Sequence, residues 1–311
     1  MTKKDGLLNR WDSDKFGMKW SSVFTFIFCL FLLFSCAHEE FRSPAQESAK
    51  SRHVVFDIDW TIVTEVTRES AKIPKNKRII EVQGKHYYIN EGLEEFVNEI
   101  LSHPEMKVSF YSGGKKARNE ELLSKIKLKN GKSLKDIAYK ILNNEDLIDV
   151  PGALPEWRFS EKHKKDLSKV SKDLSELIMF DDTAHFVFEG KELQSNHVFF
   201  IGTAFEYFDN FEEARNLSGD YIPKSYEEWL LNQKKLLILQ GAFKEAYEEA
   251  VDGKMSFAEA MKQKEELLNL KDHYWNEHSR RYFKMMGGRA PVQIKLPSND
   301  CLQGMRVIMG L

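Results

Sequence analysis

The residues of this sequence whose types and spacing best suit chemistry are aspartates that directly follow short apolar runs. Asp57 and Asp59 follow one run, and Asp181 and Asp182 follow another. A carboxyl group with an ordinary pKa of about 4 is ionised at neutral pH, so Asp57 could attack phosphorus and form an aspartyl-phosphate. In an extended strand Asp59 lies on the same side as Asp57, where its carboxyl could protonate the leaving oxygen and then activate water.

Carboxylates this close to one another need a cation. A hard divalent ion with oxygen ligands suits Asp57, Asp181 and Asp182, and we expect Mg²⁺, which would also neutralise charge on a phosphate substrate. The histidines, among them His86 and His163, show no ligand spacing. No zinc site is therefore expected.

Hydroxyl groups should complete a site for phosphate. Thr61 follows the first acid pair, and Ser112 ends another apolar run just before Gly113-Gly114. The two hydroxyls could donate hydrogen bonds to phosphoryl oxygens, and Gly113 is assigned to phosphate binding with them. Other interpretations stay open, because Ser112 could simply cap the following helix and the second acid pair could cap another.

Parallel strands are needed to bring these separated segments to one edge. The predicted strands are the apolar runs at 54–56, 107–111, 177–180 and 197–201. Helical spacing over 93–101 and 134–142 separates them, which indicates βαβ units and a parallel sheet covered on both faces. Ligands bind at the carboxyl ends of the strands in such a sheet. The alternating run 78–89 around Gly84 predicts a β-hairpin inserted beside the site.

The expected fold is therefore α/β, a Rossmann-like parallel sheet with a small β-hairpin insertion and a C-terminal helical extension. The extension begins with a long amphipathic helix from Tyr226 to a stop at Asp252-Gly253. A capping box of Ser256 and Glu259 starts a second helix, and its pattern runs on to Gly287-Gly288. We expect these helices to pack against the catalytic domain.

The segment Asp57-Ile58-Asp59-Trp60-Thr61 resembles the first motif, DxDxT, of phosphatases in the haloacid dehalogenase superfamily. Ser112 and the pair Asp181-Asp182 resemble the second and fourth motifs of that superfamily. The resemblance implies hydrolysis of phosphate monoesters, because the dehalogenases lack the second carboxylate of the first motif. It also implies that Asp59 gives its backbone carbonyl to the metal ion.

Within the superfamily, residues 52–212 most resemble the phosphatases that act on the C-terminal repeat domain of RNA polymerase II. The likeness includes the stretch 165–181 and the hairpin, and it selects Lys165 from the basic run 162–165 as the phosphate-binding lysine. Trp60 departs from that group, which has a smaller polar residue there. Its ring could stack on a base or sugar of the substrate, or pack under the hairpin.

Residues 1–36 are typical of an export signal. Basic residues precede an apolar run over 23–34, which is shorter than the ~20 apolar residues of a membrane-spanning helix. The end of the run resembles the bacterial lipoprotein box, which implies lipidation of Cys36 and attachment to the membrane on the periplasmic side of the cell envelope. An uncleaved anchor and a start at Met18 stay open. Residues 37–51 predict a flexible tether.

Composition limits the partners. The chain has 46 basic and 48 acidic residues, so no overall field attracts it to nucleic acid. The expected domains are a signal at 1–36, a tether at 37–51, a catalytic domain at 52–212 and a helical extension at 213–311. The expected substrate is a phosphorylated small molecule or a phosphoprotein, and neither its identity nor the oligomeric state follows from the sequence.

Three functions agree with these observations. The first is hydrolysis of a phosphate monoester through an aspartyl-phosphate. The second is phosphotransfer, in which an acceptor alcohol replaces water. The third is an envelope binding protein that keeps the fold without catalysis. The complete set of acids and Lys165 favours an enzyme, and we expect a hydrolase.

Overall fold

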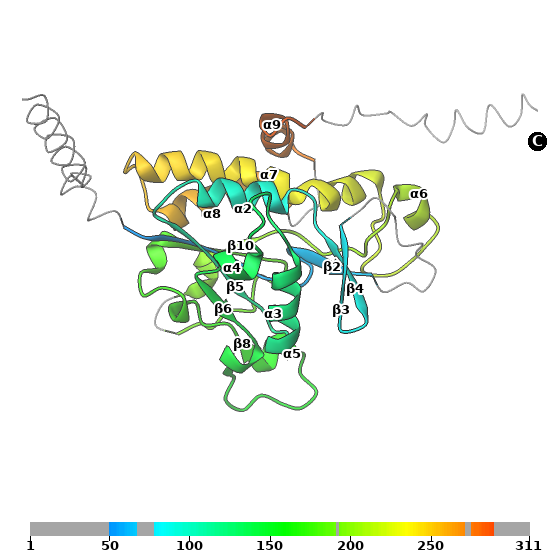
Figure 1. Cartoon of the computed structure of the whole chain (residues 1–311), viewed down its shortest axis with the longest axis horizontal. Helices are drawn as coiled ribbons and strands as arrows, with labels where there is room; N and C mark the ends of the chain where they lie inside the picture. Colours follow the sequence, from blue (N-terminus) through cyan, green and yellow to red (C-terminus); the bar gives the residue numbers. More distant parts are fainter. Residues whose placement is uncertain (1–49, 67–77, 191–192, 271–274, 289–311) are drawn as a thin grey trace, which may run out of the picture. The chain divides into compact units, whose positions relative to one another are not determined.

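The computed structural model describes residues 50–66, 78–190, 193–270 and 275–288. Figure 1 colours these residues by their position in the chain. The predicted signal and its lipidation site at Cys36 lie outside the described residues, as does nearly all of the tether. The signal, the lipidation of Cys36 and the tether therefore stay predictions.

A five-stranded parallel sheet forms the centre of the described chain (Figure 1). Its strands are β1 (Arg52–Phe56), β5 (Met106–Tyr111), β6 (Lys140–Leu142), β9 (Leu177–Asp181) and β10 (Val198–Phe200). Their order is β10-β9-β1-β5-β6, and every neighbouring pair is parallel. This arrangement confirms the predicted α/β fold, and it places the ends of β1, β5 and β9 side by side.

The central strands β1, β5 and β9 are buried on both faces, as expected of a parallel sheet covered on both sides. Side chains alternate between two clusters, with Val54 and Phe56 in one and Val55 in the other. β9 repeats the pattern, since Phe180 joins the first cluster and Met179 the second. Continuous apolar runs such as Val54-Val55-Phe56 form central strands because both faces exclude water.

Helices surround the sheet. The α-helices are α2 (Leu93–Leu101), α3 (Lys116–Lys125), α4 (Leu134–Ile137), α5 (Phe159–Lys162), α6 (Phe211–Ala214), α7 (Tyr226–Val251), α8 (Phe257–Leu268) and α9 (Glu277–Met285). Short 3-10 turns are η1 (Asn144–Asp146), η2 (Leu167–Lys169), η3 (Leu174–Glu176) and η4 (Gln194–His197). A two-stranded antiparallel ribbon joins β7 (Ile148–Asp149) to β8 (His163–Lys164).

The predicted hairpin is present and has a third strand. β3 (Ile79–Val82) and β4 (Lys85–Ile89) are antiparallel around Gly84, whose φ of 77° suits glycine. β2 (Val63–Glu65) pairs with the other edge of β4. Since β2 begins six residues after Asp57, the small sheet is joined directly to the turn formed by residues 57–62.

Two predicted helices end differently in the structure. The helix expected over 134–142 stops at Ile137, and Lys140–Leu142 forms β6 beside β5. Pairing with the sheet edge overrides the helical spacing of the apolar residues there. The helix started by Ser256 ends at Leu268 with Asn269 in the left-handed conformation, and α9 is a separate helix. The capping box itself is confirmed.

The C-terminal helices share their hydrophobic core with the sheet. Leu236, Leu239 and Phe243 of α7 belong to the same buried cluster as Phe56 and Phe180 of the sheet. The expected packing of the extension against the catalytic domain is therefore present, and α7 runs beside α2 and α8 (Figure 1). Among the described helices, none is both long enough and apolar enough to cross a membrane.

Candidate active site

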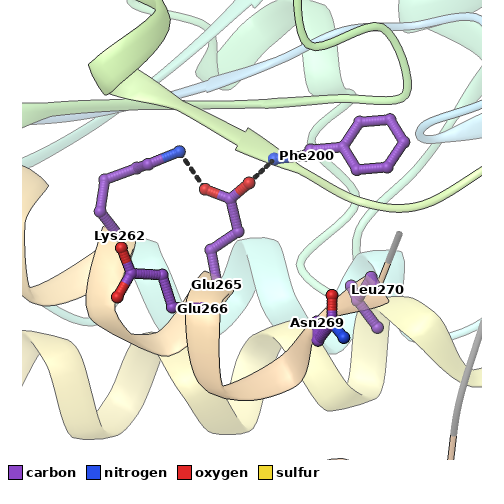
Figure 2. Close-up of a pocket in the computed structure, with 6 residues that line it drawn as sticks. All are labelled: Phe200, Lys262, Glu265, Glu266, Asn269 and Leu270. Atoms are coloured by element: carbon purple, nitrogen blue, oxygen red, sulfur yellow. Dashed lines mark hydrogen bonds and ion pairs between the residues drawn. The ribbon is translucent and has the colours of Figure 1, made fainter. Parts of the chain in front are cut away.

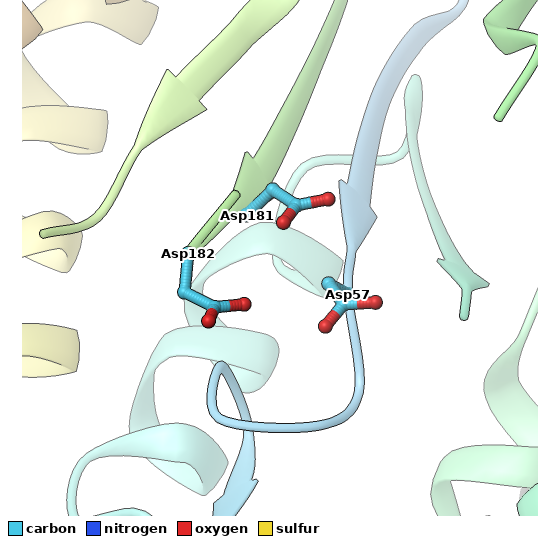
Figure 3. Close-up of side chains that lie close together, drawn as sticks. All are labelled: Asp57, Asp181 and Asp182. Carbon is cyan, nitrogen blue, oxygen red and sulfur yellow. The ribbon is translucent and has the colours of Figure 1, made fainter. Parts of the chain in front are cut away.

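Three acids meet where β1 and β9 end. Asp57 follows β1, Asp181 is the last residue of β9, and Asp182 follows it (Figure 3). The sheet ladder continues to this point, because the Asp57 amide donates to the carbonyl of Phe180 at 2.9 Å. One carboxylate oxygen from each acid lies within 4.8 Å of the others. Three carboxylates at this spacing are a suitable donor set for Mg²⁺, so the residues fit the predicted ion.

Lys165 is the cation of this cluster. Its ammonium donates to Oδ1 of Asp57 and to Oδ2 of Asp181, both at 2.7 Å, and the side chain is fully buried. Backbone bonds fix it, since its amide donates to Phe186 and its carbonyl accepts from Phe188. Lys162 and Lys164 instead donate to backbone carbonyls of Pro155 and His185. The structure thus places in the site the one lysine of the run that the resemblance selects.

Burial dominates the electrostatics of the acids. It raises the pKa of Asp57 well above its ordinary value, against the opposing charge of Lys165. Burial and the neighbouring charge of Asp181 raise the pKa of Asp182 to about 7. For Lys165, burial opposes the charge, but the two carboxylates outweigh it and raise its pKa. The simple expectation of an unperturbed pKa for Asp57 therefore does not hold, because the effect of burial outweighs the charge of Lys165.

Asp59 lies in a turn after β1 and not in the strand. Ile62 and Val63 both donate their amides to the carbonyl of Ile58, which closes that turn. Strand alternation is therefore the wrong reason for the position of Asp59. Its side chain is 34% exposed, and the carboxylate accepts hydrogen bonds from Ser112 Oγ at 3.3 Å and from the guanidinium of Arg118. Asp59 is thus the more accessible acid, which suits proton exchange with a substrate.

The other predicted phosphate-binding residues lie at or next to the site. Ser112 is buried after β5, and its hydroxyl also accepts the amide of Gly114 at 3.0 Å. Gly113 lies against the ring of Phe159, which would be only 2.7 Å from an added Cβ. Thr61 is fully buried, and its hydroxyl has no hydrogen-bond partner among the described residues. Their contacts with phosphate stay predictions.

Two cations of the site were missed by sequence reasoning. Arg118 of α3 pairs with Asp59, and its guanidinium lies 5.1 Å from the ring centre of Tyr87. Lys235 of α7 is 3% exposed and donates to the carbonyl of Trp60 at 3.2 Å. Burial lowers the pKa of Lys235 to about 8, against the opposing charge of Asp182.

Signals for these two residues differ. Lys235 lies four residues after Leu231 and four before Leu239, both buried, so a lysine interrupts the apolar stripe of a helix. A lysine at a buried position of a helix indicates a specific interaction, so this residue could have been found from the sequence. Arg118 has no such signal, since basic residues are ordinary on the exposed face of a helix. Trp60 stacks on Tyr221 of the C-terminal extension, with ring centres 5.7 Å apart.

A separate pocket of about 340 Å³ lies between β10 and α8 (Figure 2). It is lined by Phe200, Lys262, Glu265, Glu266, Asn269 and Leu270. Glu265 accepts the amide of Phe200 at 3.2 Å and Lys262 donates to the carbonyl of Val198 at 2.7 Å, so these two side chains hold α8 to the strand. None of the predicted site residues lines this pocket, and the chemistry belongs to the acid cluster.

In this parallel sheet Asp57 follows one central strand, the pair Asp181-Asp182 ends the next, and the buried Lys165 joins them. This arrangement defines a phosphatase of the haloacid dehalogenase type. Residues 52–202 match the model of the NLI interacting factor-like phosphatase family. The match contains Asp57, Asp59, Ser112, Lys165 and Asp181-Asp182.

Solved structures with a distant likeness include two of one enzyme. A variant of fission yeast Fcp1, an RNA polymerase II C-terminal-domain phosphatase, bound to beryllium fluoride, is 16% identical over 86% of this chain and 68% of its own, with a TM-score of 0.35. Another structure of Fcp1 is 18% identical over 76% of this chain, which spans 61% of that one, with a TM-score of 0.36. Similarity at this level supports no conclusion about substrate. Among curated proteins, none matches the sequence significantly.

Proposed function

We propose that this protein is a magnesium-dependent phosphomonoester hydrolase that acts through an aspartyl-phosphate on Asp57. The observation that carries the proposal is the buried ammonium of Lys165, which bridges Asp57 and Asp181 at 2.7 Å each. A lysine held there keeps a positive charge where the phosphoryl group of a substrate would meet the nucleophile. Electrostatic stabilisation of this kind is often the largest contribution to catalysis.

The reaction follows from the positions of the two acids. A carboxylate oxygen of Asp57 attacks phosphorus, and the bond between phosphorus and the ester oxygen breaks. Asp59 gives its proton to the departing alcohol oxygen. Water then attacks phosphorus of the aspartyl-phosphate, Asp59 accepts a proton from that water, and inorganic phosphate leaves as the Asp57 carboxylate is restored. Arg118 and Ser112 hold the Asp59 carboxylate between these steps.

Asp57, Asp181 and Asp182 would hold the magnesium ion, with the carbonyl of Asp59 as a further ligand. When bound, Mg²⁺ supplies positive charge that offsets the acids and the phosphate. The binding test needs no turnover. Calorimetry should detect Mg²⁺ binding to the wild-type chain, weakened strongly in Asp181→Asn.

The primary experiment is phosphate release from an aryl phosphate by the purified full chain, with and without Mg²⁺. We expect activity that requires the ion and is lost in Asp57→Asn, because the amide cannot act as the nucleophile. A circular dichroism spectrum and melting curve of the variant serve as the folding control. Activity that survives this substitution would exclude the mechanism.

We further propose that the enzyme works at the cell envelope, attached by lipid on Cys36. Support comes from the apolar run at 23–34 and the residues that end it. Labelling of cells with a tagged fatty acid should mark the wild-type protein and leave Cys36→Ala unmarked. A labelled variant would exclude Cys36 as the acceptor. A phosphorylated small molecule or phosphoprotein at that location would be the substrate.

A further inference from the structure

A lysine from the C-terminal extension contacts the turn formed by residues 57–62, which carries Asp59. Lys235 lies ten residues into α7, and its side chain is 3% exposed. Its ammonium donates to the carbonyl oxygen of Trp60 at 3.2 Å, the one hydrogen bond it makes among the described residues. Burying an ammonium group is costly unless it interacts with something specific. The acceptor is in the residue between Asp59 and Thr61, which indicates that this contact supports the turn carrying Asp59.

The backbone at Trp60 needs such support. Its φ of 63° lies in the left-handed region, which is uncommon for a residue with a side chain. Its amide donates to the carbonyl of Val63 at 2.7 Å, so both sides of this residue are held by hydrogen bonds. The conformation turns the chain between Asp57 and Thr61 and so sets where Asp59 points. Strained backbone of this kind is characteristic of functional sites.

The helix that carries Lys235 is itself firmly placed. The indole of Trp229 donates to the carbonyl of Phe208 at 3.1 Å, and Lys234 forms an ion pair with Glu91 just before α2. Leu231 and Leu239, one turn away on either side of Lys235, are buried. The ammonium therefore comes from a rigid element and not from a flexible segment. The negative charge of Asp182 also attracts this ammonium.

We propose that Lys235 is a positioning residue of the active site. Its ammonium fixes the carbonyl of Trp60, which holds the turn that aims Asp59 at the departing oxygen. The extension is then part of the catalytic apparatus, although it lies outside the residues matched by the family. This inference rests on the proposed phosphatase function for its kinetic consequence, and on the contacts alone for its structural one.

The test compares Lys235→Met with Lys234→Met in the full chain. Both variants lose one positive charge from the same helix, but Lys234 pairs with Glu91 outside the turn. We expect K235M to lower kcat for an aryl phosphate by about a hundredfold, since small displacements of a catalytic group have effects of this size. KM should change much less, because Lys235 contacts no substrate. K234M should keep both constants near the wild-type values.

Hydrogen exchange supplies a readout that does not depend on activity. The amides of Trp60, Ile62 and Val63 are hydrogen-bonded within the turn and should be protected from exchange. In K235M we expect faster exchange in the peptide covering 57–66, with the strands of the central sheet unchanged, and in K234M the wild-type pattern. Unchanged exchange in folded K235M would overturn the proposal, as would an unchanged kcat. An inactive wild-type chain would overturn the phosphatase function, and the exchange comparison would still decide the role of Lys235.

Discussion

The pair of aspartates in the first motif has two different environments. The side chain of Asp57 is 8% exposed and bound to Lys165, whereas the side chain of Asp59 is 34% exposed and bound to Arg118. Two carboxyls of the same kind can take different roles when their surroundings differ. The buried, lysine-bound acid suits attack on phosphorus, and the accessible one suits proton transfer.

Asp59→Asn should slow hydrolysis most for substrates whose leaving group is basic, because such a group must be protonated as it departs. General acid catalysis contributes about 10²–10⁴-fold, and most of this should be lost with a basic alkoxide or phenolate. With a leaving group as acidic as dinitrophenol, the loss in the first step should be small. The measurement is the rate of phosphate-ester cleavage across a series of aryl phosphates, plotted against the pKa of the leaving group. A variant with the same slope against leaving-group pKa as wild type would contradict the role.

Arg118→Met should lower kcat by about ten- to a hundredfold, because a hydrogen bond to a charged group contributes about 1.5–3 kcal/mol. Its guanidinium is the cation that holds the Asp59 carboxylate. Lys116→Met, on the exposed face of the same helix, is the matched control and should leave kcat unchanged. Steady-state kinetics on one aryl phosphate compare them. Equal activity in both variants would exclude a part for Arg118.

Asp182 should make the metal-free protein sensitive to pH. Burial raises its pKa from 3.8 to about 7 in the folded state. Between these values the folded protein binds a proton more tightly than the unfolded chain, so stability falls as pH rises from 4 through 7. Asp182→Asn removes this penalty. In chelator, its gain in melting temperature over wild type should be larger at pH 8 than at pH 5, and an equal gain at both would contradict the pKa shift.

At the scale of elements, the close contact of α7 with α9 depends on a glycine. A Cβ added at Gly241 would lie 2.8 Å from Cβ of Tyr282 and 3.0 Å from its carbonyl oxygen. Alanine in the middle of a helix is normally favoured over glycine by about 1 kcal/mol. At Gly241 the steric conflict with Tyr282 would oppose this preference and make alanine the less stable residue.

Gly241→Ala should therefore destabilise the protein, by about 1–3 kcal/mol as for other overpacked sites. The measurement is the free energy of unfolding in urea. Glu248→Ala, at an exposed position of the same helix, is the control and should have little effect. A stabilised Gly241→Ala would mean that α9 does not pack on α7 in this way.

Sequence patterns predicted the regular elements better than the irregular ones. The apolar runs before Asp57 and Asp181 form central strands because both faces of a parallel sheet are buried. Lys140–Leu142 was wrongly predicted as helix, because three residues at a sheet edge carry too little pattern to reveal their pairing. Lys165 lies in an irregular segment fixed by long-range backbone bonds, so only the family resemblance identified it.

At the scale of the whole molecule, the C-terminal extension and the central sheet share one hydrophobic cluster. Leu236, Ile238 and Leu239 of α7 are fully buried in the cluster that contains the sheet residues Phe56 and Phe180. Contacts between segments so distant in sequence are invisible to local periodicity. They also mean that the extension cannot be treated as an appendage.

A chain that ends at residue 212 should therefore fail to fold cooperatively. Removing α7 to α9 exposes one face of the core to water, at a cost of about 25 cal/mol for each Å² of apolar surface. Expression, solubility and thermal unfolding of residues 50–212 and 50–288 make the comparison. A soluble fragment 50–212 with a sharp unfolding transition would contradict the core shared by the sheet and the extension.

The central claim, a phosphoryl group passed through Asp57, is tested most directly by finding the covalent intermediate. The full chain is mixed with an aryl phosphate and Mg²⁺, quenched in acid, reduced with borohydride and mapped by mass spectrometry. Borohydride converts an acyl phosphate on aspartate to homoserine. We expect this conversion at residue 57, in the wild-type chain and only when substrate is present. Active enzyme with conversion at another aspartate, or with none under conditions that mark a known aspartyl-phosphate enzyme, would contradict it.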